Sequence, residues 1–127
     1  MSRMLGQRWE RIAERWLSSR QVKVLERNFT CRAGEIDLIA LDGEYIAFVE
    51  VKFRSSSNFG WAAEHVTRSK QVKILRAAKN YLKYHAHSPT QVFRFDVISI
   101  DRAGNTTDVR WIKDAFRAFE SSGTRFD

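Results

Sequence analysis

Apolar residues recur every three or four positions in two segments of the chain, which predicts two amphipathic helices. The first helix is expected over residues 5–17, before a pair of serines. The second is expected over residues 67–85, with Thr67 or Ser69 as its N-cap. The inward face of this second helix is expected to consist of Val72, Leu75, Ala78 and Leu82.

Segments rich in Val, Ile, Phe and Tyr predict five strands. The Asp42-Gly43 dipeptide predicts a type I′ turn that sets Leu41 opposite Glu44. A short helical turn is expected over residues 114–119. The order of helix, three strands, helix and two strands predicts an α/β fold, with a central mixed five-stranded sheet flanked by helices. The predicted strands cover residues 22–29, 36–41, 45–53, 92–100 and 107–111.

Composition and charge narrow the class of protein without naming a reaction. The 127 residues, 43% of them hydrophobic, are expected to form one domain over 1–127 with an ordered core at about 5–119. No apolar run is long enough to span a membrane, and the single cysteine, Cys31, cannot form an internal disulfide, so a soluble cytoplasmic protein is expected. The net charge of +7 favours a polyanionic partner such as DNA, although RNA or an anionic membrane surface would attract it too.

Two carboxylates, Asp37 and Glu50, interrupt otherwise apolar strands. An unpartnered carboxylate is costly to bury, so a shared partner is expected. In the predicted turn register Asp37 lies opposite Phe48 and diagonal to Glu50, a backbone separation of about 7–8 Å across which two side chains can share a divalent cation. Side-chain alternation places Lys52 on the same face as Glu50.

Such a set suits phosphodiester hydrolysis, because oxygen ligands select Mg²⁺ or Mn²⁺ and a nearby lysine can orient an attacking water. The pattern alone leaves a structural reading equally open. In that reading Asp37 and Glu50 belong to an ion-pair network with Lys52 and nearby arginines. A related choice applies to Asp96, which is expected to be the buried partner of a basic residue rather than part of the site.

Residues 34–40 (Gly-Glu-Ile-Asp-Leu-Ile-Ala) and residues 48–52 (Phe-Val-Glu-Val-Lys) resemble the PD-(D/E)XK nuclease signature, with Ile36 where that signature often has proline. From Gly6 to about Phe116 the chain resembles the YraN family of small bacterial proteins, which are similar to archaeal Holliday-junction resolvases. The further similarities are at Glu10, Ala13, Cys31, Arg32, Phe59, Gly60 and residues 94–97.

The resemblance implies a restriction-endonuclease-like core that binds Mg²⁺ or Mn²⁺ through Asp37, Glu50 and the carbonyl of Val51. It also implies that Lys52 assists the attacking water and that Glu10 completes the catalytic set. Helical spacing independently places Glu10 at the edge of the apolar face of the first helix.

The resemblance and the charge together predict an endonuclease that cleaves DNA, with branched or structured DNA as substrate. Phosphate contacts are expected from Arg54 and from a basic stripe on the second helix, although such a stripe can also be an ordinary solvated face. By analogy with resolvases, a homodimer is expected. The alternative is a catalytically silent nucleic-acid-binding or assembly factor that retains the nuclease fold. The stripe consists of Lys70, Lys73, Arg76, Lys79 and Lys83.

Overall fold

The computed structural model describes residues 2–54, 66–85 and 87–117, and the YraN-like Phe59 and Gly60 lie outside this part of the chain. Both predicted helices and all five predicted strands are present, most of them one to three residues longer than predicted. The described elements are α1 (Ser2–Ser18), β1 (Lys23–Cys31), β2 (Gly34–Asp42), β3 (Tyr45–Arg54), α3 (Arg68–Tyr84), β4 (Val92–Ala103) and β5 (Thr106–Phe116).

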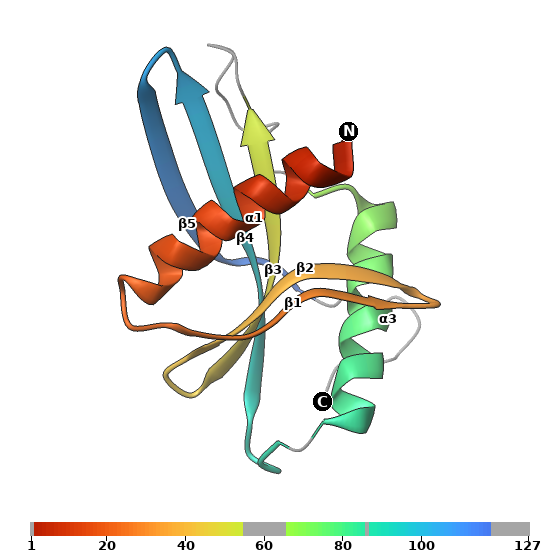
Figure 1. Ribbon diagram of the computed structural model, residues 1–127. Helices are drawn as coiled ribbons and strands as arrows, with labels where there is room; N and C mark the ends of the chain where they lie inside the picture. Colours follow the sequence, from red (N-terminus) through yellow and green to blue (C-terminus); the bar gives the residue numbers. More distant parts are fainter. Residues whose placement is uncertain (1, 55–65, 86, 118–127) are drawn as a thin grey trace.

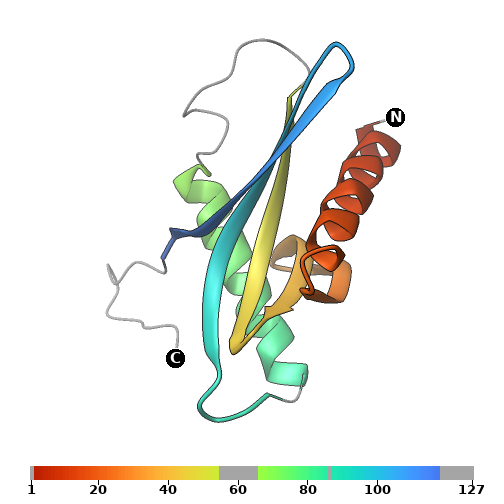
Figure 2. The ribbon, with the colours of Figure 1, turned by 90° about the vertical axis from the view of Figure 1, so that its left-hand side faces the viewer.

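The five strands form one sheet in the order β1-β2-β3-β4-β5. The β3–β4 pair is parallel and the other pairs are antiparallel. Helix α1 covers one face of the sheet and α3 covers the other, as Figures 1 and 2 show from two sides. The predicted mixed five-stranded sheet flanked by helices is therefore confirmed. Neither described helix is long and apolar enough to cross a membrane.

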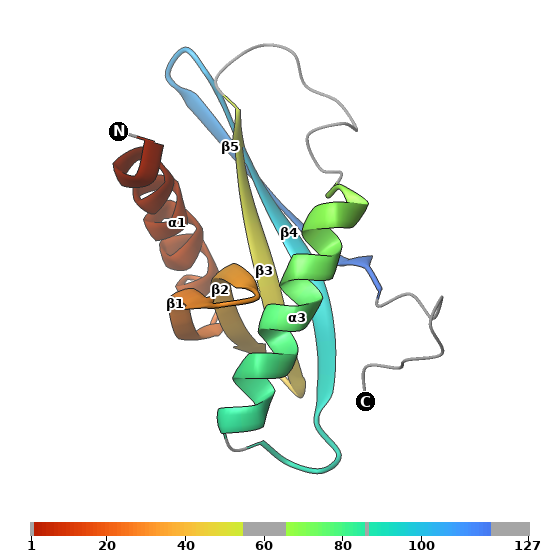
Figure 3. The same ribbon diagram turned by 90° about the vertical axis from the view of Figure 1, so that its right-hand side faces the viewer.

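The sheet separates two apolar cores. On one side, Trp9, Ala13 and Leu17 of α1 pack on Leu38, Ala47 and Ile98 of the sheet. The other core lies beneath α3, and Figure 3 shows this helix crossing the sheet on the side opposite α1. Together the two cores hold the three central strands between the helices.

The predicted inward face of α3 is only partly right. Ala78 is buried, but Val72, Leu75 and Leu82 are only partly covered. The buried face is instead formed by two fully buried alanines and by a tyrosine whose ring packs edge-on against Phe48. The buried residues of α3 are Ile74, Ala77, Ala78 and Tyr81.

The turn between β2 and β3 differs from the prediction by one residue on each side. Asp42 pairs with Tyr45, so Gly43 and Glu44 form the loop. Gly43 has φ +59° whereas Glu44 has a negative φ, a combination typical of a type II′ turn rather than type I′. The register moves by two residues in total, so every side chain keeps its predicted face. If this register were continued by one residue beyond the Leu38–Val49 pair, Asp37 would lie opposite Glu50.

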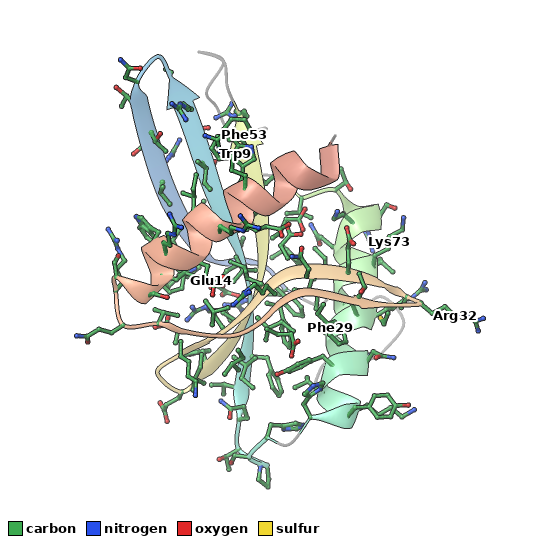
Figure 4. The ribbon with its side chains drawn as sticks, viewed as in Figure 1. Trp9, Glu14, Phe29, Arg32, Phe53 and Lys73 are labelled. Atoms are coloured by element: carbon green, nitrogen blue, oxygen red, sulfur yellow. The ribbon has the colours of Figure 1, made fainter. Side chains whose placement is uncertain are left out.

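Strands β2 and β3 separate beyond the Leu38–Val49 pair, and we call this point the strand fork. The β1–β2 hairpin continues and passes across α3, with Arg32 near its tip (Figures 1 and 4). Asn28, with φ +52°, lies where the side chains of β1 change face. Before it Arg27 pairs with Glu14 of α1, and after it Phe29 packs on the α3 side. The fork therefore opens the sheet to residues from both helices.

Strand β5 extends to Phe116, so the predicted helical turn is wrong for residues 114–116, and residues 118 and 119 lie outside the described chain. Asp114 has φ +56° in a bulge, and its backbone N–H donates to Oδ1 of Asp96 at 2.9 Å. Asp96 is fully buried and also pairs with Arg94 at 2.9 Å. The structural role predicted for Asp96 is confirmed, and its carboxylate helps to hold the bulge in strand form.

We expect Gly34→Ala to lower the free energy of unfolding by about 1–2 kcal/mol. A Cβ at Gly34 would lie 3.0 Å from the backbone carbonyl oxygen of Lys73 in α3, so hairpin and helix would have to move apart. Urea unfolding measures the change, with Gly43→Asn as the control in open space at a positive φ that asparagine tolerates. Equal stability of Gly34→Ala and wild type would show that this close approach is not important.

Candidate metal centre

Three carboxylates from three different elements approach one another at the strand fork. Asp37 belongs to β2 and is the first residue beyond the β2–β3 ladder. Its Oδ2 accepts a hydrogen bond of 2.8 Å from the backbone N–H of Val51, so the side chain bridges the two strands where their backbone pairing stops. Glu50 is the first residue of β3 beyond the same ladder and is only 8% exposed. The third carboxylate, Glu10, comes from α1 and interacts with Asp37.

Burial and the proximity of the three carboxyl groups raise their pKa values. Burial, reinforced by repulsion from Asp37, raises the pKa of Glu10 to about 7. The same two causes raise the pKa of Glu50 to about 7, although Lys70 and Lys52 oppose them. Burial also raises the pKa of Asp37, despite the hydrogen bond from Val51. The nearby basic groups therefore do not supply enough positive charge to offset burial and repulsion among the three carboxylates near neutral pH.

The position of Glu10 follows from the packing of its neighbour. The Trp9 ring stacks on Phe53 of β3 with a centroid distance of 3.5 Å, and Figure 4 shows the two rings together. Glu10 follows Trp9 directly in α1, and its side chain interacts with Asp37 at the fork. Oε1 of Glu10 is buried there and has no hydrogen-bond partner among the described residues. An unpartnered buried carboxylate oxygen is costly, so a cation at this point would relieve it.

The residues present fit a divalent cation only as a partly formed site. Within the described ranges, no three His, Cys, Asp or Glu side chains form a ready metal-binding group. A site built from Asp37 and Glu50 with the Val51 carbonyl needs only two carboxylates, however. The crowded carboxylates and the unpartnered oxygen of Glu10 are the features that a divalent cation would neutralise.

Two lysines flank Glu50. Lys70, in the first turn of α3, has its Nζ 3.5 Å from Oε2 of Glu50. Lys52 lies two residues along β3 on the same face, and it forms no ion pair with any residue that the structure describes. The contact of Lys70 was not predicted, because sequence spacing alone does not bring the start of α3 to the fork.

The residues predicted to contact DNA fall into two groups. Arg54 pairs with Asp101 through a 3.1 Å hydrogen bond and is 19% exposed, which makes it a weak candidate for a phosphate contact. Lys73 and Arg76 are exposed on α3, and Figure 4 shows Lys73 on that helix beside the hairpin. Sequence reasoning missed a second basic surface on α1, whose signal is arginine at helical spacing. Its exposed members are Arg8, Arg11 and Arg15.

We expect the metal-free protein to lose stability between about pH 5 and pH 8. A carboxyl group whose pKa is higher in the folded state stabilises the fold below its unfolded pKa, and this contribution disappears as pH rises through the folded pKa. For Glu50 the rise from 4.5 to about 7 corresponds to at most about 3 kcal/mol. Thermal unfolding at several pH values, with a chelator or with Mg²⁺, measures the effect.

Glu50→Gln should flatten this pH profile and raise the melting temperature of the metal-free protein at pH 8. Mg²⁺ should stabilise wild type mainly at the higher pH values and should stabilise the variant little. A structural ion pair would behave in the opposite way, because its removal would destabilise the protein at pH 8.

Comparison with known proteins places these residues in a family. A family model described as "Uncharacterised protein family UPF0102" matches residues 9–100, a range that includes the three carboxylates and both lysines. A UPF0102 protein of Aeromonas hydrophila is 49% identical over 112 residues, which cover 87% of this chain and 83% of that protein.

Two further relatives carry the same description. A UPF0102 protein of Photobacterium profundum is 47% identical over 110 residues, with 86% of each chain covered. One from Nitrosospira multiformis is 44% identical over 115 residues, covering 90% of this chain and 93% of its own. The resemblance to YraN proteins is confirmed at this level, and the chain belongs to the UPF0102 (YraN) family.

Proposed function

We propose that this protein is a metal-dependent endonuclease with a restriction-endonuclease-like core, and that it hydrolyses phosphodiester bonds in branched or otherwise structured DNA. The observation that carries the proposal is the convergence of Glu10, Asp37 and Glu50 at the strand fork with raised pKa values. A bound divalent cation would neutralise these clustered carboxylates, and such clusters are typical of functional sites.

The roles of the residues follow from their positions. Asp37, Glu50 and the Val51 carbonyl would hold Mg²⁺ or Mn²⁺. When bound, such an ion supplies a more acidic water and neutralises phosphate charge. Lys52 would orient the water that attacks phosphorus, while the bond from phosphorus to the leaving oxygen breaks. Glu10 would support the site through its buried carboxylate.

In a purely structural ion-pair network, basic neighbours would lower the pKa of each carboxyl group. Asp42 provides an example within the same protein. Burial acts to raise the pKa of Asp42, but hydrogen bonds and charge from Arg94 and Lys113 outweigh it and lower the pKa. Asp37 and Glu50 show no such compensation, because basic neighbours reduce their shifts without reversing them. This difference favours a cation-binding role for Asp37 and Glu50 over a completed ion-pair network.

Basic surfaces on both helices support a nucleic-acid substrate. The exposed Lys73 and Arg76 lie on α3, and the exposed Arg8 and Arg11 lie on α1 on the other face of the sheet. The two surfaces flank the fork, so a DNA with arms in two directions could contact both while its backbone reaches the carboxylates. Two copies of the chain would suit a symmetric junction.

The test is a panel of labelled DNA substrates: duplex, single strand, flap and four-way junction. Each is incubated with Mg²⁺, Mn²⁺ or a chelator, and binding is measured in parallel at matched salt. We expect metal-dependent cleavage of at least one structured substrate, with cleavage lost and binding retained in Asp37→Ala and Lys52→Ala. Binding without cleavage in any metal, unchanged by either substitution, would instead support a silent binding or assembly factor.

A further inference from the structure

Lys70 occupies a position where the rules of helix capping disfavour a lysine. Thr67 is the N-cap of α3, and its Oγ1 accepts a hydrogen bond from the backbone N–H of Lys70 at 3.2 Å. The residue three positions after a Thr N-cap is most favourably Glu or Gln, which completes a capping box. A cation there also faces the positive end of the helix dipole, and the first turn of α3 contains no acidic residue. Lys70 is therefore poorly explained by the stability of its own helix.

The contacts of Lys70 lie at the carboxylate site. Its Nζ is 3.5 Å from Oε2 of Glu50, and its charge acts on Asp37 as well. Lys70 forms an ion pair with Glu50, whereas Lys52, a residue of the recognised motif, forms none with any residue that the structure describes. Its side chain is 41% exposed while that of Glu50 is 9% exposed, so Lys70 reaches into the fork from the solvent side.

Lys70 is also well placed to leave the fork. It is connected to the site by one ion pair, and its backbone is fixed by the cap of α3 while the long side chain remains partly in solvent. The next basic side chain along the stripe, Lys73, is exposed on the same helix. A phosphate group that follows the stripe towards the fork would therefore meet Lys70 last.

We propose that Lys70 is a second lysine of the site: its ammonium group partly neutralises the carboxylates in the metal-free protein, and it contacts the backbone phosphate of bound DNA once a divalent cation replaces it. This inference rests on the proposed function. It assigns Lys70 to the reacting phosphate rather than to general DNA attraction, and it explains how buried carboxylates are tolerated before a metal binds.

The first test uses the DNA-free protein and does not depend on activity. Mn²⁺ affinity is measured by titration calorimetry at pH 7.5 for wild type, Lys70→Met, Lys70→Arg and Lys79→Met. Because the ammonium group competes with the cation, Lys70→Met should bind Mn²⁺ more tightly by about two- to fivefold. Lys79→Met loses the same charge on an exposed part of the same helix and should match wild type, as should Lys70→Arg to a first approximation.

The second test measures cleavage at saturating DNA and Mn²⁺. Lys70→Met should be slower by about tenfold or more despite its tighter metal binding, and Lys70→Arg should recover part of the rate. If wild type binds Mn²⁺ and Lys70→Met binds it equally well or more weakly, the inference about Lys70 is overturned while the proposed function stands. Failure of wild type to bind Mn²⁺ would overturn the inference together with the proposed function.

Discussion

Asp37→Asn is expected to reduce the rate of DNA cleavage by at least about 10³-fold while leaving the protein folded. The substitution removes the negative charge that would hold the cation, but the remaining amide oxygen can still accept the hydrogen bond from the backbone N–H of Val51. The strand fork should therefore keep its shape. Single-turnover cleavage of the best substrate, at saturating protein, measures the loss without interference from product release.

The matched control is Asp108→Asn, which removes the same charge from an exposed position of β5. It should cleave like wild type. Melting temperatures of both variants exclude unfolding as the cause. A rate for Asp37→Asn within about threefold of wild type would show that Asp37 does not participate in the chemistry.

Asp96→Ala is expected to destabilise the protein by about 3–5 kcal/mol, because it leaves the buried charge of Arg94 without its main partner. Asp96 is fully buried and accepts hydrogen bonds of 2.9 Å from Arg94, from Nε1 of Trp111 and from the backbone N–H of Asp114. Its loss would release the β5 bulge as well as the ion pair.

Urea unfolding measures this effect, and two further variants keep the test informative. Asp96→Asn retains a polar group of the same shape, so it should be destabilised less than Asp96→Ala and should fold if the alanine variant does not. Asp108→Ala, on the exposed part of β5, should change stability by less than about 0.5 kcal/mol. A loss below about 1 kcal/mol for Asp96→Ala would contradict the structural importance of this network.

The central elements of the fold could be predicted because local patterns determine them. The apolar spacing of Trp9, Ala13 and Leu17 matches the buried face of α1, and Thr67 caps α3 as expected. The mixed sheet followed from the order of elements. The register of the β2–β3 hairpin was two residues off, because Asp-Gly is compatible with a turn centred on either side of Gly43.

Other features depend on contacts that no local pattern contains. The opening of the fork at Asp37 arises where the hairpin leaves β3 to pack on α3, and the positive φ of Asn28 assists it. The pair of Lys70 with Glu50 joins residues 20 positions apart from different elements, and only the arrangement of α3 over the sheet brings them together. The long β5 depends in the same way on Asp96, whose carboxylate binds the bulge backbone.

The candidate site could be predicted in composition but not in geometry. Motif residues Asp37, Glu50 and Lys52 were identified together with Glu10, and the structure brings the three carboxylates to one point. Spacing suggested that Asp37 lies diagonal to Glu50 within a paired hairpin, whereas the observed pairing ends at Leu38 and Val49, just before both carboxylates. Arg54 was selected for its place next to the motif, but its pairing with Asp101 could not be read from sequence.

The most direct test of the account is Mn²⁺-dependent cleavage of a four-way junction by wild type and by Glu50→Gln, purified side by side. Parallel purification matters because a contaminating nuclease would be present in both preparations. We expect cleavage by wild type that disappears with a chelator, and no cleavage by Glu50→Gln at equal junction binding. Equal cleavage by both proteins, or none by wild type on any substrate of the panel, would contradict it.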